Sequence, residues 1–399
     1  MSPRLRTLED LGDVAGVRIL VRCDFNVPLD AEGRITEDLR IRATLPTVRE
    51  LLGAGAVPIL CSHLGRPKGV PDPRYSLAPV ADRLGDLLGR PVTFVDDVVG
   101  PRARAAVDVA ASGSVVLLQN LRFEPGETAN DPAFADALAA LADAYVDDAF
   151  GAAHRAHASV VGVPERLPAR AAGRLLQREV EVLSKLREDP DRPFVAILGG
   201  AKISDKLGVV EALLERVDAL LVGGAMAFSF LAVQGHEVGR SLVESDRYDD
   251  VRRALAVAAE RGVAIQLPLD VVCAPEATAD APRVTVPADR MPADQIGLDV
   301  GPRTVEAFAR TIAGARTVLW NGPMGMFELG PFAEGTRGVA KSVAAADAFT
   351  VAGGGDSVAA LRTLGLADAV DHLSTGGGAS LEFIEGRELP GIAVLMEGE

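Results

Sequence analysis

Cysteine is scarce in this chain. Its 399 residues include only three cysteines, Cys23, Cys61 and Cys273, and no pair of them forms a CxxC motif. Disulfide-stabilised secreted domains and thiolate zinc clusters need more cysteines at closer spacings. The sequence therefore excludes a disulfide framework and a cysteine-ligated zinc site. A reducing compartment fits this composition best, so we expect a cytoplasmic protein.

Long apolar segments and an excess of positive charge are also missing. The longest uncharged apolar run, residues 219–233, is shorter than the roughly 20 residues of a membrane-spanning helix. The N-terminal residues turn acidic where a signal peptide needs an apolar core. The net charge of −15 repels nucleic acid and anionic lipid. We expect no secretion, no membrane insertion and no nucleic-acid partner, and any anionic ligand requires a local group of basic residues.

Short apolar runs alternate along the chain with alanine- and leucine-rich stretches of helical spacing. This alternation predicts parallel sheets covered by helices on both faces. The length allows two to three domains of roughly 150 residues. We therefore predict two Rossmann-like, three-layer α/β/α domains with mostly parallel sheets. The predicted strands are residues 17–21, 57–60, 92–95, 115–118 and 144–146, then 194–198, 219–222, 263–267, 317–320, 349–351 and 372–374.

A helical pattern at residues 173–188 separates the two halves. Two prolines, Pro164 and Pro168, precede it, and a proline-rich turn at residues 189–193 ends it. We predict that residues 1–172 form the first domain, 173–188 a connecting hinge helix, and 189–387 the second domain. The apolar segment at residues 388–399 follows a turn and should dock on a domain surface, although the pattern alone does not say which.

Basic residues follow the predicted strands of the first half. In open α/β sheets, ligands bind at the carboxyl ends of the strands, and guanidinium groups pair well with phosphate and carboxylate. These positions therefore predict a small ligand with several negative charges, the alternative being isolated surface charges. His154 and His157 form an HxxH pair without the glutamate of HExxH, which is a weak metal signature. The basic residues concerned are Arg22, Arg40, His63, Arg66, Arg122, His154 and Arg155.

Glycine replaces arginine at the corresponding strand ends of the second half. Pairs or triplets of glycine occur at residues 199–200, 223–224, 353–355 and 376–378, and an Asn-Gly-Pro-Met-Gly loop starts at residue 321. Glycine lets the backbone approach phosphate, and a following helix N-terminus favours an anion. Five such loops predict a nucleotide. Because GxxxxGK(S/T) and GxGxxG motifs are absent, the nucleotide must be held in another way.

Four charged residues of the second half allow more specific predictions. Lys202 and Lys206 are four residues apart, which predicts one face of a helix's first turns, and two cations there favour a bound anion over solvated lysines. Asp356 is the best-placed carboxylate for magnesium, and Glu328 could accept hydrogen bonds from ribose hydroxyls. The alternatives are a helix cap for Asp356 and a solvated loop acid for Glu328.

Seven ordered motifs resemble those of the phosphoglycerate kinase family, and the resemblance covers nearly the whole chain. They are RCDFNVP (22–28), SHLGRP (62–67), DAFGAAHRAH (148–157), LGGAKISDK (198–206), WNGPMGMFE (320–328), GGGDS (353–357) and STGGGAS (374–380). The resemblance implies a two-lobed enzyme that transfers a phosphoryl group between 1,3-bisphosphoglycerate and ADP, with Mg²⁺, to give 3-phosphoglycerate and ATP. It also implies a monomer whose last residues pack on the N-terminal lobe.

The resemblance further assigns roles to individual residues. The phosphoglycerate site would comprise Asp24, Phe25, Asn26, Arg40, His63, Leu64, Gly65, Arg66, Arg122 and Arg155. The nucleotide site would comprise Gly200, Lys202, Lys206, Gly224, Gly297, Asn321, Glu328, Gly353, Gly354, Gly355, Asp356 and Ser357, with Asp356 also holding the metal. The catalytic residues would be Arg40, Lys202, Gly377 and Gly378. Cys23, Asp147 and Ala225 depart from the usual Val, Asn and Gly, but none of these changes removes a charged or phosphate-contacting group.

The chemistry implied by the resemblance agrees with the residue pattern. Phosphoryl transfer needs positioning and electrostatic stabilisation by Arg, Lys, Mg²⁺ and backbone N–H groups. A general base is unnecessary, because the nucleophile of the reverse reaction is a carboxylate already ionised at neutral pH. We expect closure about the 173–188 helix to bring the substrates together. Two alternatives stay open: an NAD-dependent dehydrogenase, disfavoured by the missing GxGxxG, and a non-catalytic protein that binds a phosphorylated metabolite.

Overall fold

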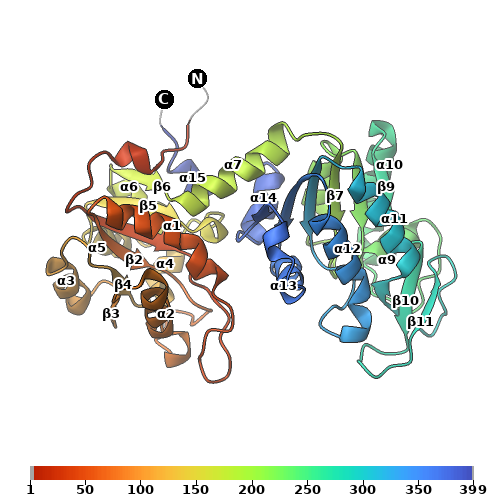
Figure 1. The fold of residues 1–399 in the computed structure, drawn as a ribbon, viewed down its shortest axis with the longest axis horizontal. Helices are drawn as coiled ribbons and strands as arrows, with labels where there is room; N and C mark the ends of the chain where they lie inside the picture. The colour runs from red at the N-terminus through yellow and green to blue at the C-terminus, as the bar shows by residue number, and fades with distance from the viewer. Residues whose placement is uncertain (1–3, 398–399) are drawn as a thin grey trace. The chain divides into compact units, whose positions relative to one another are not determined.

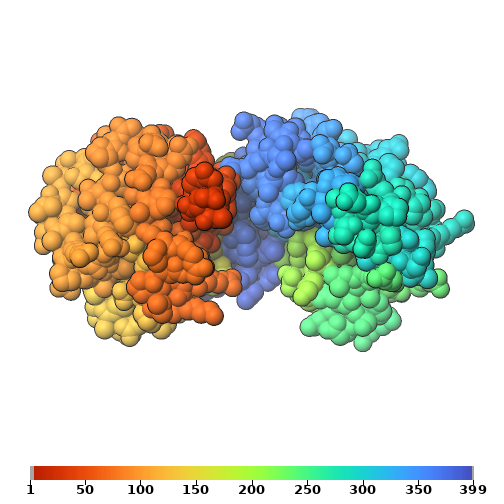
Figure 2. Space-filling view, turned by 90° about the horizontal axis from the view of Figure 1, so that it is seen from below, coloured from red at the N-terminus to blue at the C-terminus, as the bar shows by residue number. Residues whose placement is uncertain are grey.

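The chain divides into two compact units, each built around a parallel sheet. The computed structural model describes residues 4–397. Unit 1 contains the residues up to Glu181 together with those from Glu388 on, and unit 2 is Val182–Arg387. Figure 1 shows helices on both sides of the sheet in each unit, and unit 1 is one continuous body, red to yellow, in Figure 2. The prediction of two parallel-sheet α/β domains is confirmed.

Unit 1 contains a six-stranded sheet of order β3-β4-β2-β1-β5-β6 in which all pairs are parallel. Its strands are β1 (Arg18–Cys23), β2 (Val57–Cys61), β3 (Thr93–Val95), β4 (Val116–Leu118), β5 (Ala144–Asp148) and β6 (Arg170–Ala172). Its helices are α1 (Leu39–Gly53), α2 (Ala78–Leu88), α3 (Pro101–Asp108), α4 (Pro125–Ala129), α5 (Pro132–Ala139), α6 (Val163–Arg166) and α15 (Pro390–Ala393). The sequence did not reveal β6, because its residues Arg-Ala-Ala include no β-branched or large apolar residue, unlike those of the equally short β3 and β4.

Unit 2 contains a second six-stranded parallel sheet of order β15-β14-β13-β7-β8-β9. Its strands are β7 (Phe194–Leu198), β8 (Ala219–Val222), β9 (Ala264–Gln266), β13 (Thr317–Asn321), β14 (Phe349–Gly353) and β15 (His372–Leu373). Its helices are α8 (Leu207–Leu214), α9 (Met226–Val233), α10 (Tyr248–Arg261), α11 (Pro302–Ala313), α12 (Glu334–Ala344), α13 (Gly355–Thr363) and α14 (Gly378–Ile384). All six strands match predicted runs.

A small antiparallel sheet in unit 2 was not predicted. Its order is β11-β10-β12, formed by β10 (Asp270–Ala274), β11 (Val284–Pro287) and β12 (Ile296–Val300). The expectation of eleven strands was therefore wrong, since residues 4–397 contain fifteen. The exposed β11, whose Val284 is 45% exposed, lacks the buried apolar run on which the strand prediction relied. None of the helices in residues 4–397 has the length and apolar character needed to cross a membrane.

The C-terminal segment returns to unit 1 and pairs with the start of the chain. Arg6 N–H donates to the Leu395 carbonyl at 3.1 Å, and Glu397 N–H donates to the Arg4 carbonyl at 2.9 Å. Gly391 N–H donates to the Ala153 carbonyl at 2.9 Å. Both ends of the described chain thus belong to the same unit.

A buried carboxylate from β5 caps the helix that connects the units. Helix α7 spans Arg174–Glu188, close to the predicted 173–188. Asp148 is fully buried, and its Oδ1 accepts from the N–H groups of Leu175 at 2.9 Å and Leu176 at 3.4 Å. A Cβ at Gly173 would lie 2.2 Å from the same oxygen, so the close approach requires glycine. Burial raises the pKa of Asp148 to about 8.

This raised pKa predicts a pH-dependent stability. An unfolded aspartate has a pKa of about 4, so between about pH 4 and 8 the folded protein binds more protons than the unfolded chain. The free energy of unfolding therefore falls as the pH rises through this range. In Asp148→Asn we expect a shallower fall between about pH 6 and 8, by up to about 1.4 kcal/mol per pH unit, measured by denaturant unfolding. Asp82→Asn, on the exposed face of α2, is the control. The prediction would be contradicted if the free energy of unfolding fell equally steeply with pH in the unmodified protein and in both variants.

Candidate functional site

Unit 1 has a basic cavity of about 440 Å³ at the carboxyl ends of its strands. Arg66 and Arg122 follow β2 and β4, and Arg155 follows β5, so the structure brings these three predicted residues together. The other lining residues are Lys68, Gly69, Glu124, Thr128 and His157. Four lining residues were not predicted from the sequence: Lys68, Gly69, Glu124 and Thr128. Lys68 stands two residues after Arg66, and this local charge could have suggested it.

The cations of this cavity outnumber its carboxylates. Arg66, Lys68, Arg122 and Arg155 face one lining carboxylate, that of Glu124. Arg122 Nη1 donates to the Gly65 carbonyl at 2.6 Å. Burial, together with the charges of Arg155 and Arg22, lowers the pKa of Arg122 to about 10. An uncompensated group of cations in a chain of net charge −15 is suited to a ligand with several negative charges.

Asp24 and Arg40 form an ion pair beside β1. Asp24 is 3% exposed, and Arg40, in the first turn of α1, donates from Nη1 to its Oδ2. Burial opposes ionisation of Asp24, but the charges of Arg40 and Arg22 and the Asn26 N–H prevail and hold the pKa of this carboxyl below its usual value. Asp24 therefore orients Arg40 and is a poor direct partner for an anion.

Other predicted residues of this site support its loops. Asn26 Oδ1 accepts from Gly65 N–H at 2.9 Å, Phe25 N–H donates to Ser62 Oγ at 2.8 Å, and Leu64 N–H donates to Asn120 Oδ1 at 3.2 Å. Phe25 is fully buried and Leu64 nearly so. These side chains and those of Asp24, Arg40 and His63 are not part of the lining of the 440 Å³ cavity. Their contacts tie the loops after β1 and β2 together.

Unit 2 has a cavity of about 390 Å³ that is apolar with a polar edge. The predicted residues Gly200, Gly224, Gly297, Glu328 and Asp356 all line it. Its apolar lining was not predicted and comes largely from α9, from the loop after β13 and from the unpredicted antiparallel sheet. A cavity of this composition suits a flat apolar group with polar substituents. The apolar lining residues include Phe228, Leu242, Val271, Ile296, Leu298, Met324 and Met326.

The prediction for Lys202 and Lys206 was wrong in its local structure. Helix α8 begins only at Leu207, with Lys206 at its N-cap, so the two lysines are not on a helical face. Lys206 Nζ turns back and donates to the Gly199 carbonyl at 2.6 Å, the Asn321 carbonyl at 3.0 Å and Asn321 Oδ1 at 2.6 Å. Burial lowers the pKa of Lys206 to about 8, although Asp356 and Asp205 oppose this. Lys202 is exposed.

The glycine loops fall into two physical classes. A Cβ at Gly199 would lie 2.0 Å from the Pro323 carbonyl oxygen, and one at Gly224 would lie 2.4 Å from the Gly200 nitrogen. These glycines are therefore required where neighbouring loops pack against each other. In contrast, a Cβ at Gly355 or Gly378 would have nothing within 4 Å, so packing does not explain their lack of a side chain.

The remaining predicted residues of unit 2 do not line the cavity. Ser357 Oγ accepts from Gly322 N–H at 2.6 Å. A Cβ at Gly354, where φ is +88°, would lie 3.1 Å from Asn321 Nδ2, and Gly377 has φ +54°. The predicted residues outside the lining are Asn321, Lys202, Lys206, Gly353, Gly354, Gly355, Ser357, Gly377 and Gly378.

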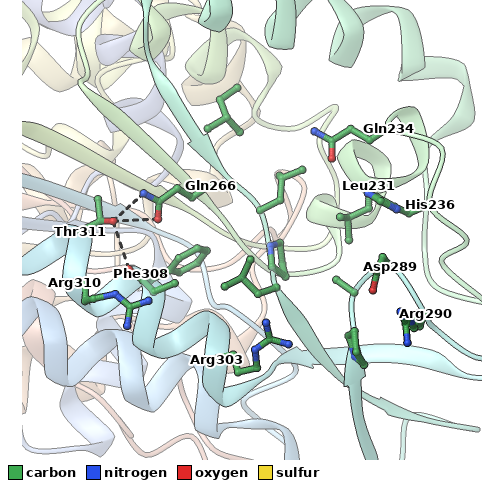
Figure 3. A pocket seen from close by; sticks show the side chains of 17 residues that line it. Leu231, Gln234, His236, Gln266, Asp289, Arg290, Arg303, Phe308, Arg310 and Thr311 are labelled. Carbon is green, nitrogen blue, oxygen red and sulfur yellow. Dashed lines mark hydrogen bonds between the residues drawn. The ribbon is translucent and has the colours of Figure 1, made fainter.

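A further cavity of unit 2, about 1050 Å³, is larger than the two candidate sites but contains none of the predicted site residues. Figure 3 shows Arg303, Phe308 and Arg310 along α11 on one side and His236 and Arg290 on the other. Gln266 and Thr311 hydrogen-bond each other in its wall. It has no glycine loop at its edge, and size alone does not make it the candidate site.

Comparison with known proteins agrees on one family. The family model described as "Phosphoglycerate kinase" matches residues 8–387. Proteins named phosphoglycerate kinase from Salinispora arenicola and Frankia alni are 60% and 59% identical, over 98% of this chain and 99% and 100% of theirs. The solved structure of phosphoglycerate kinase from Coxiella burnetii has a TM-score of 0.87 and 39% identity, covering 98% of this chain and 99% of that chain.

Proposed function

This chain belongs to the phosphoglycerate kinase family, and from that premise we propose which of its residues carry out the family's reaction. That reaction is the glycolytic transfer of a phosphoryl group between 1,3-bisphosphoglycerate and ADP, giving 3-phosphoglycerate and ATP. We assign the arginine-lined cavity of unit 1 to phosphoglycerate and the apolar cavity of unit 2 to ADP or ATP. The observation that carries this assignment is the contrast between four lining cations in one cavity and an apolar, glycine-edged lining in the other.

In the acid site, the arginines divide into two groups. Arg66, Arg122 and Arg155 line the cavity and are suited to bidentate contacts with the substrate's stable phosphate. Arg40 is held by Asp24 instead of projecting freely, so it is preorganised to stabilise charge on the phosphoryl group in transfer. Lys202 and the backbone N–H groups of Gly377 and Gly378 supply the same stabilisation from unit 2.

The transfer needs no general base from the protein. The nucleophile in the direction of ATP consumption is the carboxylate of 3-phosphoglycerate, and carboxyl groups with a pKa of about 4 are ionised at neutral pH. The protein's contribution is alignment of the two oxygens with the phosphorus and stabilisation of the equatorial charge. This fits a site whose charged groups are mainly arginine and lysine.

The nucleotide site combines an apolar cavity with a helix N-terminus. Glu328 lines the cavity and is placed to accept from ribose hydroxyls, while Gly355 and Asp356 begin α13, whose unpaired N–H groups favour phosphate. Asp356 also fits Mg²⁺, because this ion is commonly held by one or two carboxylates plus nucleotide phosphates. Within residues 4–397 no group of three potential metal ligands occurs, so the nucleotide would supply the other ligands. Bound there, Mg²⁺ would neutralise phosphate charge.

The lowered pKa of Lys206 gives a testable pH dependence. Its ammonium loses charge as the pH rises through about 8, and the loss should weaken the loop's attraction for phosphate. We expect the KM for ATP to rise several-fold between about pH 7 and 9 in the unmodified enzyme and to stay nearly constant in Lys206→Arg, since arginine stays protonated. Steady-state kinetics at a fixed saturating concentration of 3-phosphoglycerate measures this, and parallel profiles for both proteins would contradict it.

Closure about α7 is part of the proposal. Arg40 belongs to unit 1 and Lys202 to unit 2, and both must approach one phosphoryl group at the distances of a near-attack geometry, about 3–3.5 Å. We expect small-angle X-ray scattering to show a smaller radius of gyration with 3-phosphoglycerate and a non-hydrolysable ATP analogue bound together than with either alone. An unchanged radius would count against closure.

A coupled assay tests the function itself. It measures ATP consumption with Mg²⁺ and 3-phosphoglycerate while the acyl phosphate is removed. We expect rapid turnover that requires the acid. A folded protein that binds 3-phosphoglycerate without turnover would support the binding-protein alternative. We further propose that the protein is cytoplasmic and monomeric. Light scattering after size-exclusion chromatography should then give the mass of one chain, 41.6 kDa.

A further inference from the structure

Unit 1 contains a buried chain of polar side chains beside the basic cavity that the mechanism above does not use. Arg22, on β1, is 1% exposed, and its Nε donates to Ser159 Oγ at 2.9 Å. The Ser159 hydroxyl donates to Glu127 Oε1 at 2.6 Å, and Ser159 N–H donates to Glu127 Oε2 at 2.9 Å. Ser159 and Glu127 are both fully buried. Glu127 Oε1 also lies 3.8 Å from Nδ1 of His157, which lines the cavity.

The other end of the Arg22 guanidinium reaches a predicted substrate residue. Arg22 Nη2 lies 3.0 Å from His63 Nδ1. A guanidinium has only N–H donors and stays protonated in proteins, so His63 Nδ1 must be the acceptor. An imidazole whose Nδ1 accepts carries its proton on Nε2. Within residues 4–397, His63 Nε2 has no hydrogen-bond partner. The residue is outside the cavity lining but is 7% exposed, so this N–H is open to a ligand that extends beyond the cavity towards β1.

The surroundings also keep the His63 ring neutral. Burial lowers its pKa well below the usual value, and the charges of Arg22, Arg122 and Arg40 act in the same direction, against Asp24. At neutral pH the ring is therefore an uncharged donor. The Ser159 hydroxyl has one proton, which goes to Glu127, and this leaves its lone pairs for Arg22.

We propose that Arg22 is a positioning residue, held by Ser159 and Glu127, that fixes His63 in the Nε2–H tautomer so that Nε2–H donates to an oxygen of bound phosphoglycerate. The opposite tautomer would present a lone pair of Nε2 to an anionic oxygen and would repel it. This inference rests on the proposed function of the basic cavity, because it takes phosphoglycerate as the ligand.

The tautomer is measured directly in the unmodified enzyme. Long-range ¹H–¹⁵N correlation spectra of protein labelled with ¹⁵N-histidine separate the five histidines, and a His63→Gln spectrum assigns His63. We expect the Nε2–H pattern at about pH 7, with a shift of the Nε2 resonance on addition of 3-phosphoglycerate. An Nδ1–H or imidazolium pattern would overturn the inference. The Nε2–H pattern with no response to 3-phosphoglycerate would also overturn the inference, because His63 would then not contact the acid, whereas the coupled assay tests the proposed function separately.

Variants test whether Arg22 is responsible. In Arg22→Met we expect a mixture of His63 tautomers, a KM for 3-phosphoglycerate raised by about tenfold as one hydrogen bond is weakened, and an unchanged KM for ATP. His63 should also titrate nearer its usual pKa, so this KM should gain a pH dependence below about pH 6.5. Ser159→Ala should change the tautomer ratio and this KM in the same direction but less. It tests the row of hydrogen-bonded side chains if Arg22→Met does not fold. Glu165→Gln, exposed on α6, is the control. A folded variant with the Nε2–H pattern and unchanged kinetics would overturn the proposal.

Discussion

Lys202→Ala is expected to lower kcat by a factor on the order of 100 to 1000, as the loss of one group that stabilises transition-state charge commonly does. Lys202 is exposed and makes no hydrogen bond or ion pair in the part of the chain that the structure describes. Its side chain therefore contributes little to folding, and substitutions of this kind usually change the free energy of unfolding by less than about 0.5 kcal/mol. The expected result is a stable enzyme with near-normal substrate binding and very slow turnover.

The separate effects of Lys202→Ala on kcat and on KM show whether Lys202 acts during the transfer or only in binding ATP. A group that contacts the phosphoryl only during transfer affects kcat and kcat/KM equally, whereas a group that only binds ATP raises KM. Lys341→Ala, exposed on α12 in the same unit, is the matched control and should behave like the unmodified enzyme. Lys202→Arg keeps the charge and should retain part of the activity. Near-normal kcat in Lys202→Ala would contradict the assignment.

Gly199→Ala and Gly378→Ala are expected to have opposite effects. The methyl group at Gly199 would lie 2.0 Å from the Pro323 carbonyl oxygen, and such overpacking costs about 3 kcal/mol when backbone must move. For a unit of this size that cost corresponds to a fall in Tm of roughly 6–12 °C. The methyl group at Gly378 meets nothing within 4 Å, so Gly378→Ala should keep its Tm or gain slightly.

At a temperature where both variants are folded, we expect Gly378→Ala, the more stable variant, to have the lower kcat. If the Gly378 backbone approaches the transferred phosphoryl group, a methyl group there obstructs it and kcat should fall at least tenfold. Gly199→Ala should retain more activity, since Gly199 acts through loop packing. Thermal unfolding followed by circular dichroism, together with steady-state kinetics, measures both properties. A Gly378→Ala protein with unchanged kcat would show that this glycine has no role in the transfer.

The sheets and the arginine cluster were predictable because each depends on a local signal. Runs such as Phe194–Leu198 are buried on both faces and read as continuous apolar segments. Basic residues just after such runs must gather at one sheet edge, as Arg66, Arg122 and Arg155 do. The roles of individual site residues came from the family resemblance, because residue spacing alone does not distinguish an arginine that binds a ligand from one on the surface.

The failures arose where long-range packing determines the structure. The exposed strand β11 exists because it pairs with β10, and no local pattern reports that pairing. Lys206 was expected on a helix, but its ammonium is drawn to the carbonyls of Gly199 and Asn321, which are distant in sequence from each other. Likewise, the resemblance did not distinguish glycines needed for packing from those with open space beside them.

The pairing of the two chain ends has a consequence for the order in which the protein can be completed during synthesis. Unit 2 is contiguous, whereas unit 1 needs residues 391–397 to satisfy the backbone groups of Arg4, Arg6 and Ala153. The ribosome makes those residues after all of unit 2. Although most of unit 1 emerges first, unit 2 is the first whose native contacts are all available, and unit 1, to which we assign the acid substrate, is finished last.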